Sequence, residues 1–333
     1  FDVLLPVGIS FYTFQALSYT MDVYRGEIYA ERNLFKYALF VSFFPQLVAG
    51  PIERSKNLLI QVNQPHYFDP DRVRNGLLLM LWGFFQKVVI ADRVAALVNQ
   101  VYGHWNEVAG VSIVLATVLF AVQIYCDFGG YSDIAIGTAE VLGFSLMKNF
   151  NQPYLSKSCG EFWHRWHISL SSWFRDYLYI PLGGNRVPAL RQYCNIFAVW
   201  ALTGLWHGAD WNFVAWGLYF GVLLVLEKRV LGGVLARAPR AVQHGYTLLV
   251  VVVSMAIFAT PGGFVPYLGK MFGGAPLMSA ETGYYLRSFL PTFLALILAA
   301  TPLPKRIFAR LPEGVRNAAG SVLMVLGLAA STV

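Results

Sequence analysis

The sequence predicts an all-α membrane protein, a polytopic bundle of transmembrane helices, and three observations support this. First, 56% of its 333 residues are apolar and only 13% are charged, whereas soluble domains contain about 25% charged residues. Second, the apolar residues form continuous runs rather than alternating ones, which favours helices over a β-barrel. Third, the net charge is +7, and the Lys and Arg residues that produce it lie scattered between these runs. That pattern is typical of positive loops beside anionic lipid and does not indicate a nucleic-acid partner.

The apolar runs are long enough, or nearly so, to cross about 30 Å of hydrocarbon at about 1.5 Å per residue. We expect roughly eight or nine helical passes, from runs near 1–21, 34–50, 76–98, 108–126, 195–207, 211–226, 246–260, 286–303 and 318–333. The connections are short and polar, so 1–333 is expected to form a single domain. Because the chain starts at Phe1 inside an apolar run, we expect an N-terminally truncated fragment.

The cysteines and histidines do not predict a metal site. Cys126, Cys159 and Cys194 are odd in number and form no CxxC pair, so neither a disulfide framework nor a thiolate zinc site is indicated. His164 and His167 have a spacing that resembles a ligand pair, but HExxH is absent. We expect no bound metal.

One polar region, 127–191, interrupts the apolar pattern with acids, bases and histidines among aromatic residues. Polar residues at membrane depth are costly and survive where they line a cavity, so this region is the first candidate for a functional site. Within it, 161–177 contains no Pro or Gly and is predicted to be one helix.

The two histidines of this predicted helix have different surroundings. His167 shares a face with Trp163 and Phe174, whereas His164 lies about 60° around the helix axis. We expect His167 to face an aromatic interior and His164 to be hydrated. A buried histidine that only bonds a backbone carbonyl is the structural alternative for His167.

His207 forms a second candidate, inside a strongly apolar run and flanked by Gly204 and Gly208. A neutral imidazole here could take a proton from a hydroxyl and return it to a leaving group. Small residues four apart also allow close helix packing, so a GxxxG packing face is an equal alternative.

Carboxylates form a third candidate, because Asp127 and Asp133 flank a Gly-Gly pair after an apolar run. They could orient a histidine or neutralise Arg165 or Arg175, or they could cap a helix that restarts near Ser132. Neither GxGxxG nor GxxxxGK[ST] nor GxSxG occurs in the sequence, which disfavours nucleotide hydrolysis and a serine acyl-enzyme.

Long motifs make the chain recognisable as a member of a family. They are LPVGISFYTFQ at 5–15, SYTMDVYRG at 18–26, FPQLVAGPIER at 44–54, CDFGGYSD at 126–133, both histidine segments, and WNFVAWGLY at 211–219. With these motifs the sequence resembles the membrane-bound O-acyltransferase superfamily. Within that superfamily it resembles the branch that acetylates bacterial exopolysaccharides such as alginate. Beyond about Lys228 the resemblance is mostly one of hydropathy.

The resemblance implies a helical fold with a central acyl-transfer tunnel, reached by the acyl donor from the cytoplasmic side. It implies that His207 is the catalytic histidine and that His167 is the second polar position of the site. As substrate-binding or supporting residues around them we expect Asp127, Asp133, Arg165, Arg175, Asp176, Trp206 and Asn212.

The resemblance further implies an acetyltransferase of the bacterial inner membrane, with multiple passes and surrounding lipid. The expected donor substrate is acetyl-CoA, with no tightly bound cofactor. The acceptor is a polysaccharide, reached directly or through a periplasmic partner protein. A D-alanyl transferase acting on teichoic acid would share the fold and the histidines, and a polytopic transporter would also place polar groups in the membrane.

Overall fold

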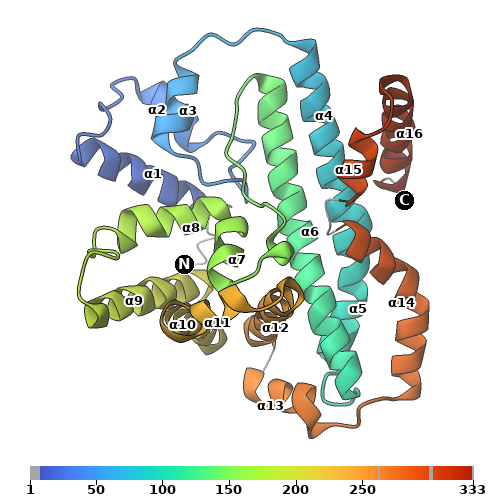
Figure 1. Cartoon of the computed structure of the whole chain (residues 1–333). Helices are drawn as coiled ribbons and strands as arrows, with labels where there is room; N and C mark the ends of the chain where they lie inside the picture. The colour runs from blue at the N-terminus through green and yellow to red at the C-terminus, as the bar shows by residue number, and fades with distance from the viewer. Residues whose placement is uncertain (1–7, 261–262, 300–302, 332–333) are drawn as a thin grey trace, which may run out of the picture.

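A computed structural model describes residues 8–260, 263–299 and 303–331, and within these residues it contains helices and no strand (Figure 1). The predicted all-α class is confirmed. The helices are α1 (Ile9–Tyr24), α2 (Leu34–Val41), α3 (Ser55–Val62), α4 (Pro70–Phe84), α5 (Asp92–Gly103), α6 (Gly110–Leu142), α7 (Cys159–Arg165), α8 (Ile168–Phe174), α9 (Ala189–His207), α10 (Trp211–Leu226), α11 (Gly232–Arg237), α12 (Arg240–Ala259), α13 (Phe264–Gly269), α14 (Ala280–Ala299), α15 (Leu303–Ala309) and α16 (Glu313–Ser331).

Several of these helices continue into π-helical turns, in which the hydrogen-bond spacing widens locally. The turns are η1 (Phe85–Ala91) between α4 and α5, η3 (Arg175–Tyr179) after α8, η4 (Glu227–Leu231) after α10, and η5 (Lys270–Gly274) after α13. A short 3-10 turn, η2 (Pro153–Leu155), precedes α7.

The longest helix, α6, lies beside α4 and meets it backbone to backbone (Figure 1). A Cβ atom on Gly130 would lie 2.7 Å from the Gly83 carbonyl oxygen, and one on Gly137 would lie 2.5 Å from the Gly76 carbonyl oxygen. Glycine is therefore required where the two helices touch. The helix also runs unbroken through 129–130, so the expectation of a helix that restarts near Ser132 is wrong.

Helix lengths differ from the apolar runs. By length and apolarity, two described helices could cross a membrane, α6 and α12, which is fewer than the passes expected. The run at 34–50 forms only the eight-residue α2 and a set of turns, and π-helical turns interrupt others. The predicted runs at 1–21, 286–303 and 318–333 lie partly outside the described residues.

Helices α9 and α10 form a tight hairpin. A Cβ atom on Gly204 would lie 2.3 Å from the Phe213 carbonyl oxygen, and one on Gly217 would lie 2.2 Å from the Trp200 carbonyl oxygen. Gly204 therefore serves helix packing, as the structural alternative expected. The hairpin leaves His207 as the last residue of α9, at the turn where the chain reverses.

Candidate active site

His167 lies between two helices rather than inside one. The predicted single helix over 161–177 is wrong, because α7 ends at Arg165 and α8 begins at Ile168. His167 itself adopts a left-handed conformation (φ 43°, ψ 55°), which costs about 1–3 kcal/mol for a residue other than glycine. The Ile168 N–H donates to the Asn149 carbonyl at 2.9 Å and helps to hold this break in place.

The break directs the His167 ring into a cluster of aromatic rings, called the aromatic chamber below, where His167 is only 3% exposed. Its ring centroid lies 4.7 to 6.5 Å from those of Phe128, Phe11, Phe150 and Trp206. His164 is exposed. The expected difference in burial between the two histidines is therefore confirmed, although it arises from a helix break and not from two faces of one helix.

His207 approaches the same chamber from the end of α9. Its ring lies 4.7 Å from Trp206, 5.0 Å from Trp216 and 5.2 Å from Phe258, centroid to centroid. Trp206 contacts both histidines, since its ring is also 6.5 Å from His167. The two predicted histidines are thus brought together around one indole.

Buried polar atoms without a hydrogen-bond partner gather in this chamber. Almost all buried polar atoms in proteins have a partner. Among the described residues, the exceptions in this cluster are three indole N–H groups, one amide oxygen and one imidazole nitrogen, on Trp163, Trp206, Trp216, Asn212 and His167, and other exceptions lie elsewhere in the protein. Ring contacts link Trp163 to Trp216, Trp216 to His207, and Trp206 to both histidines. Such an arrangement suits a ligand that carries its own polar groups.

Asn212, at the start of α10, is a further predicted residue that the structure places here. Its Nδ2 donates to the Phe258 carbonyl oxygen at 2.8 Å, and its Oδ1 is one of the unpartnered atoms. Since Phe258 also contacts His207, Asn212 lies on the His207 side of the chamber.

The predicted carboxylates of α6 bind other groups. Asp127 forms an ion pair with Lys87 at 2.7 Å, and Asp133 accepts a hydrogen bond from Gln86 at 2.8 Å. The expectation that they orient a histidine or neutralise Arg165 or Arg175 is therefore wrong. Their partners lie on η1, so these contacts join α6 to the segment that follows α4.

Arg165 also has a local partner, because its Nη2 lies 2.7 Å from Glu161, one turn earlier on α7. Its Nη1 donates to the Asn151 carbonyl oxygen at 3.3 Å. Both contacts fix Arg165, the last residue of α7, two residues before His167. Among the described residues, no three His, Cys, Asp or Glu side chains gather as metal ligands.

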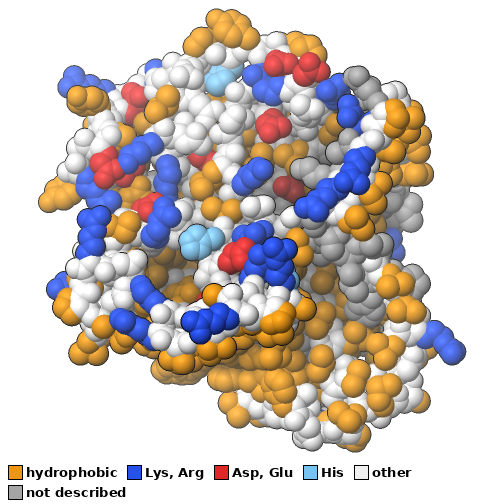
Figure 2. All heavy atoms as spheres, in the orientation of Figure 1, with side chains coloured by type: hydrophobic (Ala, Val, Ile, Leu, Met, Phe, Trp, Pro, Cys, Tyr) orange, Lys and Arg blue, Asp and Glu red, His pale blue; other side chains and the backbone are white. Residues whose placement is uncertain are grey.

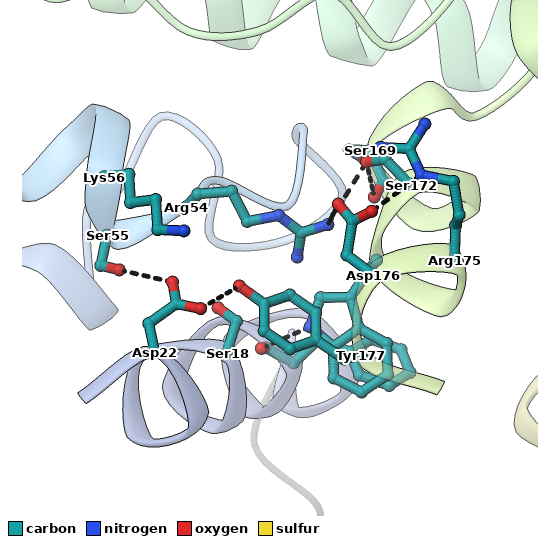
Figure 3. Close-up of polar contacts among 12 residues, drawn as sticks. Ser18, Asp22, Arg54, Ser55, Lys56, Ser169, Ser172, Arg175, Asp176 and Tyr177 are labelled. Atoms are coloured by element: carbon teal, nitrogen blue, oxygen red, sulfur yellow. Dashed lines mark hydrogen bonds and ion pairs between the residues drawn. The ribbon is translucent and has the colours of Figure 1, made fainter. Parts of the chain in front are cut away.

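Arg175 and Asp176 belong to a polar network beside the chamber (Figure 3). Arg175 Nε donates to Asp176 Oδ1 at 2.7 Å, and Asp176 Oδ2 lies 3.8 Å from Arg54 Nη2. Arg54 also lies over the ring of Tyr177, whose hydroxyl donates to the buried Asp22 at 2.8 Å. The network therefore connects α8 and η3 to α1 and to the start of α3.

Sequence reasoning missed two buried residues near the site. Asn149, in the loop after α6, contacts His167 and the start of α8. Glu53 is fully buried, and it accepts hydrogen bonds from the Met147 N–H at 2.5 Å and from Asn57 at 2.6 Å. Burial raises the pKa of the Glu53 carboxyl. A signal was present only for Glu53, which follows the largely apolar stretch 43–52, whereas Asn149 has Lys148, Asn151 and Gln152 beside it.

A helical fold that places the buried His167 and the half-buried His207 around one indole fits a helical membrane enzyme. Residues 30–269 match the membrane-bound O-acyltransferase family, and the chain belongs to this family. It is 45% identical over 256 residues to the "Probable alginate O-acetylase AlgI" of Pseudomonas aeruginosa, a match that covers 77% of this chain and 49% of that protein.

More distant relatives also match a large part of this chain. The peptidoglycan O-acetyltransferase of Helicobacter pylori is 36% identical, over 68% of this chain and 48% of that protein. The teichoic acid D-alanyltransferase of Bacillus subtilis is 28% identical, over 66% of this chain and 58% of that protein. The chain spans about half the length of the curated relatives it matches.

Proposed function

We propose that the protein is a membrane O-acetyltransferase that transfers an acetyl group towards an envelope exopolysaccharide of the alginate type. The observation that carries this proposal is the pair of histidines, His167 and His207, on either side of Trp206 within a chain of this family. The higher identity to the alginate O-acetylase than to the D-alanyltransferase, 45% against 28%, supports acetyl over D-alanyl transfer.

The chemistry is acyl transfer to oxygen, with acetyl-CoA as the donor. His207 acts as the general base and takes the proton of the acceptor hydroxyl as its oxygen attacks the acetyl carbonyl carbon. The carbon–sulfur bond then breaks, and the imidazolium returns its proton to the leaving thiolate. General acid–base catalysis of this kind contributes about 10²–10⁴-fold to the rate, and alignment inside a water-excluding chamber contributes more.

The proposal places the protein in the bacterial inner membrane as a multi-pass protein, with the donor arriving from the cytoplasm. The acceptor hydroxyl belongs to the polysaccharide or to a periplasmic partner protein that relays the acetyl group. Membranes supplied with radiolabelled acetyl-CoA, with and without that partner, would distinguish the two acceptors. Labelled D-alanine transfer without acetyl transfer would instead support the teichoic acid alternative, and solute flux without any acyl product would support a transporter.

His207→Ala provides the direct test. We expect polymer acetylation to fall by about 10²-fold or more, while the amount of protein in the membrane is unchanged. His104→Ala is the matched control, because His104 is exposed at the end of α5 and its loss should leave acetylation intact. Wild-type acetylation by His207→Ala would contradict the proposal.

A further inference from the structure

The Asn149 side chain has a fixed orientation. The backbone N–H of Ser169 lies 3.3 Å from Asn149 Oδ1. Because a backbone N–H can only donate, the atom that faces it must be the amide oxygen and not the amide nitrogen. On its other side, Asn149 Nδ2 donates to Ser132 Oγ at 3.2 Å. All three residues are buried, so the network decides which way the amide points.

The amide orientation in turn decides which nitrogen of His167 carries the proton. His167 Nδ1 lies 3.0 Å from the same Asn149 oxygen, and an amide oxygen can only accept. The Ser169 hydroxyl lies 3.4 Å from Nδ1, but it donates its proton to the same amide oxygen at the shorter distance of 2.9 Å. Nδ1 therefore holds the proton and donates. A neutral imidazole has one N–H, so the other nitrogen, Nε2, presents a lone pair.

This lone pair lies within the ring cluster. His167 Nε2 is buried and has no hydrogen-bond partner among the residues that the structure describes, and aromatic rings surround the imidazole. Protonating Nε2 as well would leave an unpaired buried charge among these rings, which costs far more than burying the neutral form. The chamber therefore offers an acceptor at this point, and the ligand group it fits is a hydrogen-bond donor.

We infer that Asn149 is a positioning residue, which holds His167 in the Nδ1–H tautomer so that His167 Nε2 accepts a hydrogen bond from a second hydroxyl of the acceptor, next to the hydroxyl that His207 deprotonates. This inference rests on the proposed function and narrows it. In this tautomer His167 orients the acceptor through that second hydroxyl, and it does not donate to the negative charge that develops on the acetyl oxygen.

Asn149 also caps α8, because its backbone and side-chain oxygens accept from the N–H groups of Ile168 and Ser169. A cap of this kind stabilises a helix. Loss of activity alone would not separate the cap from the tautomer, so the test needs a readout of the imidazole proton itself.

The experiment records ¹⁵N–¹H spectra of ¹⁵N-histidine-labelled protein in detergent or lipid, with the His167 signals assigned by their loss in His167→Gln. We expect the Nδ1–H tautomer at His167 in the wild type and in Asn149→Asp, which keeps the accepting oxygen. In Asn149→Leu we expect this tautomer to be lost. Asn151→Leu is the matched control, since the Asn151 side chain is exposed nearby, and it should change nothing.

Kinetics of acetyl transfer accompany the spectra. In Asn149→Leu we expect kcat to fall about 10–100-fold, with the KM for acetyl-CoA unchanged, whereas Asn149→Asp should stay within about threefold. An Nε2–H tautomer in the wild type would overturn the inference whatever the activity. A tautomer change in Asn149→Leu without loss of kcat would overturn the positioning role. A wild type with the Nδ1–H tautomer but no acetyl transfer would instead reject the proposed function and leave the tautomer assignment standing.

Discussion

At the scale of single residues, the site depends on one strained position. His167 stands where two short helices meet, and its left-handed backbone turns the ring inward. If His167 continued a single helix, α7 and α8 would merge and the ring would lose its contact with Asn149. Both histidines therefore stand where regular helical structure stops: His167 at the strained break between α7 and α8, and His207 at the end of α9.

Replacing each histidine of the α7–α8 segment by alanine should have unequal effects. We expect His167→Ala to reduce acetylation about 10–100-fold, because the ring lies in the chamber and orients a reactant. His164→Ala should stay within about threefold of wild type, because this ring is exposed and its Nδ1 lies only near the Gly160 carbonyl, at 2.6 Å. Acetylation measured in membranes at equal protein level checks both. Equal losses would mean that the catalytic chamber includes His164.

Sequence alone could identify the two histidines but not what they touch. Motif and spacing singled out His167 and His207, and their burial could be predicted from apolar neighbours. Asn149 could not be predicted, because its contact with His167 depends on a helix break that no Pro or Gly marks. The partner of Asp127 could not be predicted either. Asp127 is close in sequence to the histidine segment, but its ion-pair partner is Lys87, which lies forty residues earlier in the chain.

At the scale of elements, glycines decide how the helices meet. Gly76 and Gly83 on α4 repeat every seven residues, as do Gly130 and Gly137 on α6, and each pair places backbone against backbone. The seven-residue spacing of these glycines is visible in the sequence and is compatible with close helix packing. The adjacent Gly129 and Gly130 predict a break instead, because two adjacent glycines usually mark a turn.

The adjacent glycines of α6 provide a matched pair for a stability test. Gly130→Ala should destabilise the protein by about 1–3 kcal/mol, because its methyl group would meet the Gly83 backbone. Gly129→Ala should be neutral or stabilising by up to about 1 kcal/mol, because the nearest atoms to its new Cβ are 3.7 Å away and alanine favours helix. Thermal unfolding in detergent measures both. Equal melting temperatures would contradict the close packing of α4 and α6.

At the scale of the whole molecule, one face carries both charged and apolar areas. On the face drawn in Figure 2, Lys and Arg side chains lie over α1, α7 and α11, whereas the lower edge around α13 is mainly apolar. At about 1.5 Å per residue the 33 residues of α6 extend about 50 Å, well beyond about 30 Å of hydrocarbon. Helix α6 must therefore tilt or project from the membrane. Apolar composition predicts lipid around the protein, but it does not show where each helix stops.

Two exposed apolar side chains on α12 allow a test of whether this helix spans the bilayer. Leu249 lies in the middle of α12 and is 56% exposed, whereas Val242 lies near its start and is 55% exposed. We expect Leu249→Lys to disfavour insertion by about 3 kcal/mol and Val242→Lys to have little effect, because a lysine near a helix end reaches the interface. Resistance to alkaline extraction from membranes measures insertion. Equal extraction of the two variants would exclude α12 as a spanning helix.

The close contact of α4 and α6 also limits how reactants can reach the histidines. Phe128, which touches the His167 ring at 4.7 Å between centroids, lies only two residues from Gly130 on α6. Where α6 faces α4, a Cβ atom added to Gly130 or Gly137 would collide with the carbonyl oxygen of Gly83 or Gly76. An acetyl chain or a sugar therefore cannot pass between α4 and α6. We expect changes in donor or acceptor preference among relatives to be concentrated instead in the other helices that supply rings to the two histidines, α1, α9, α10 and α12.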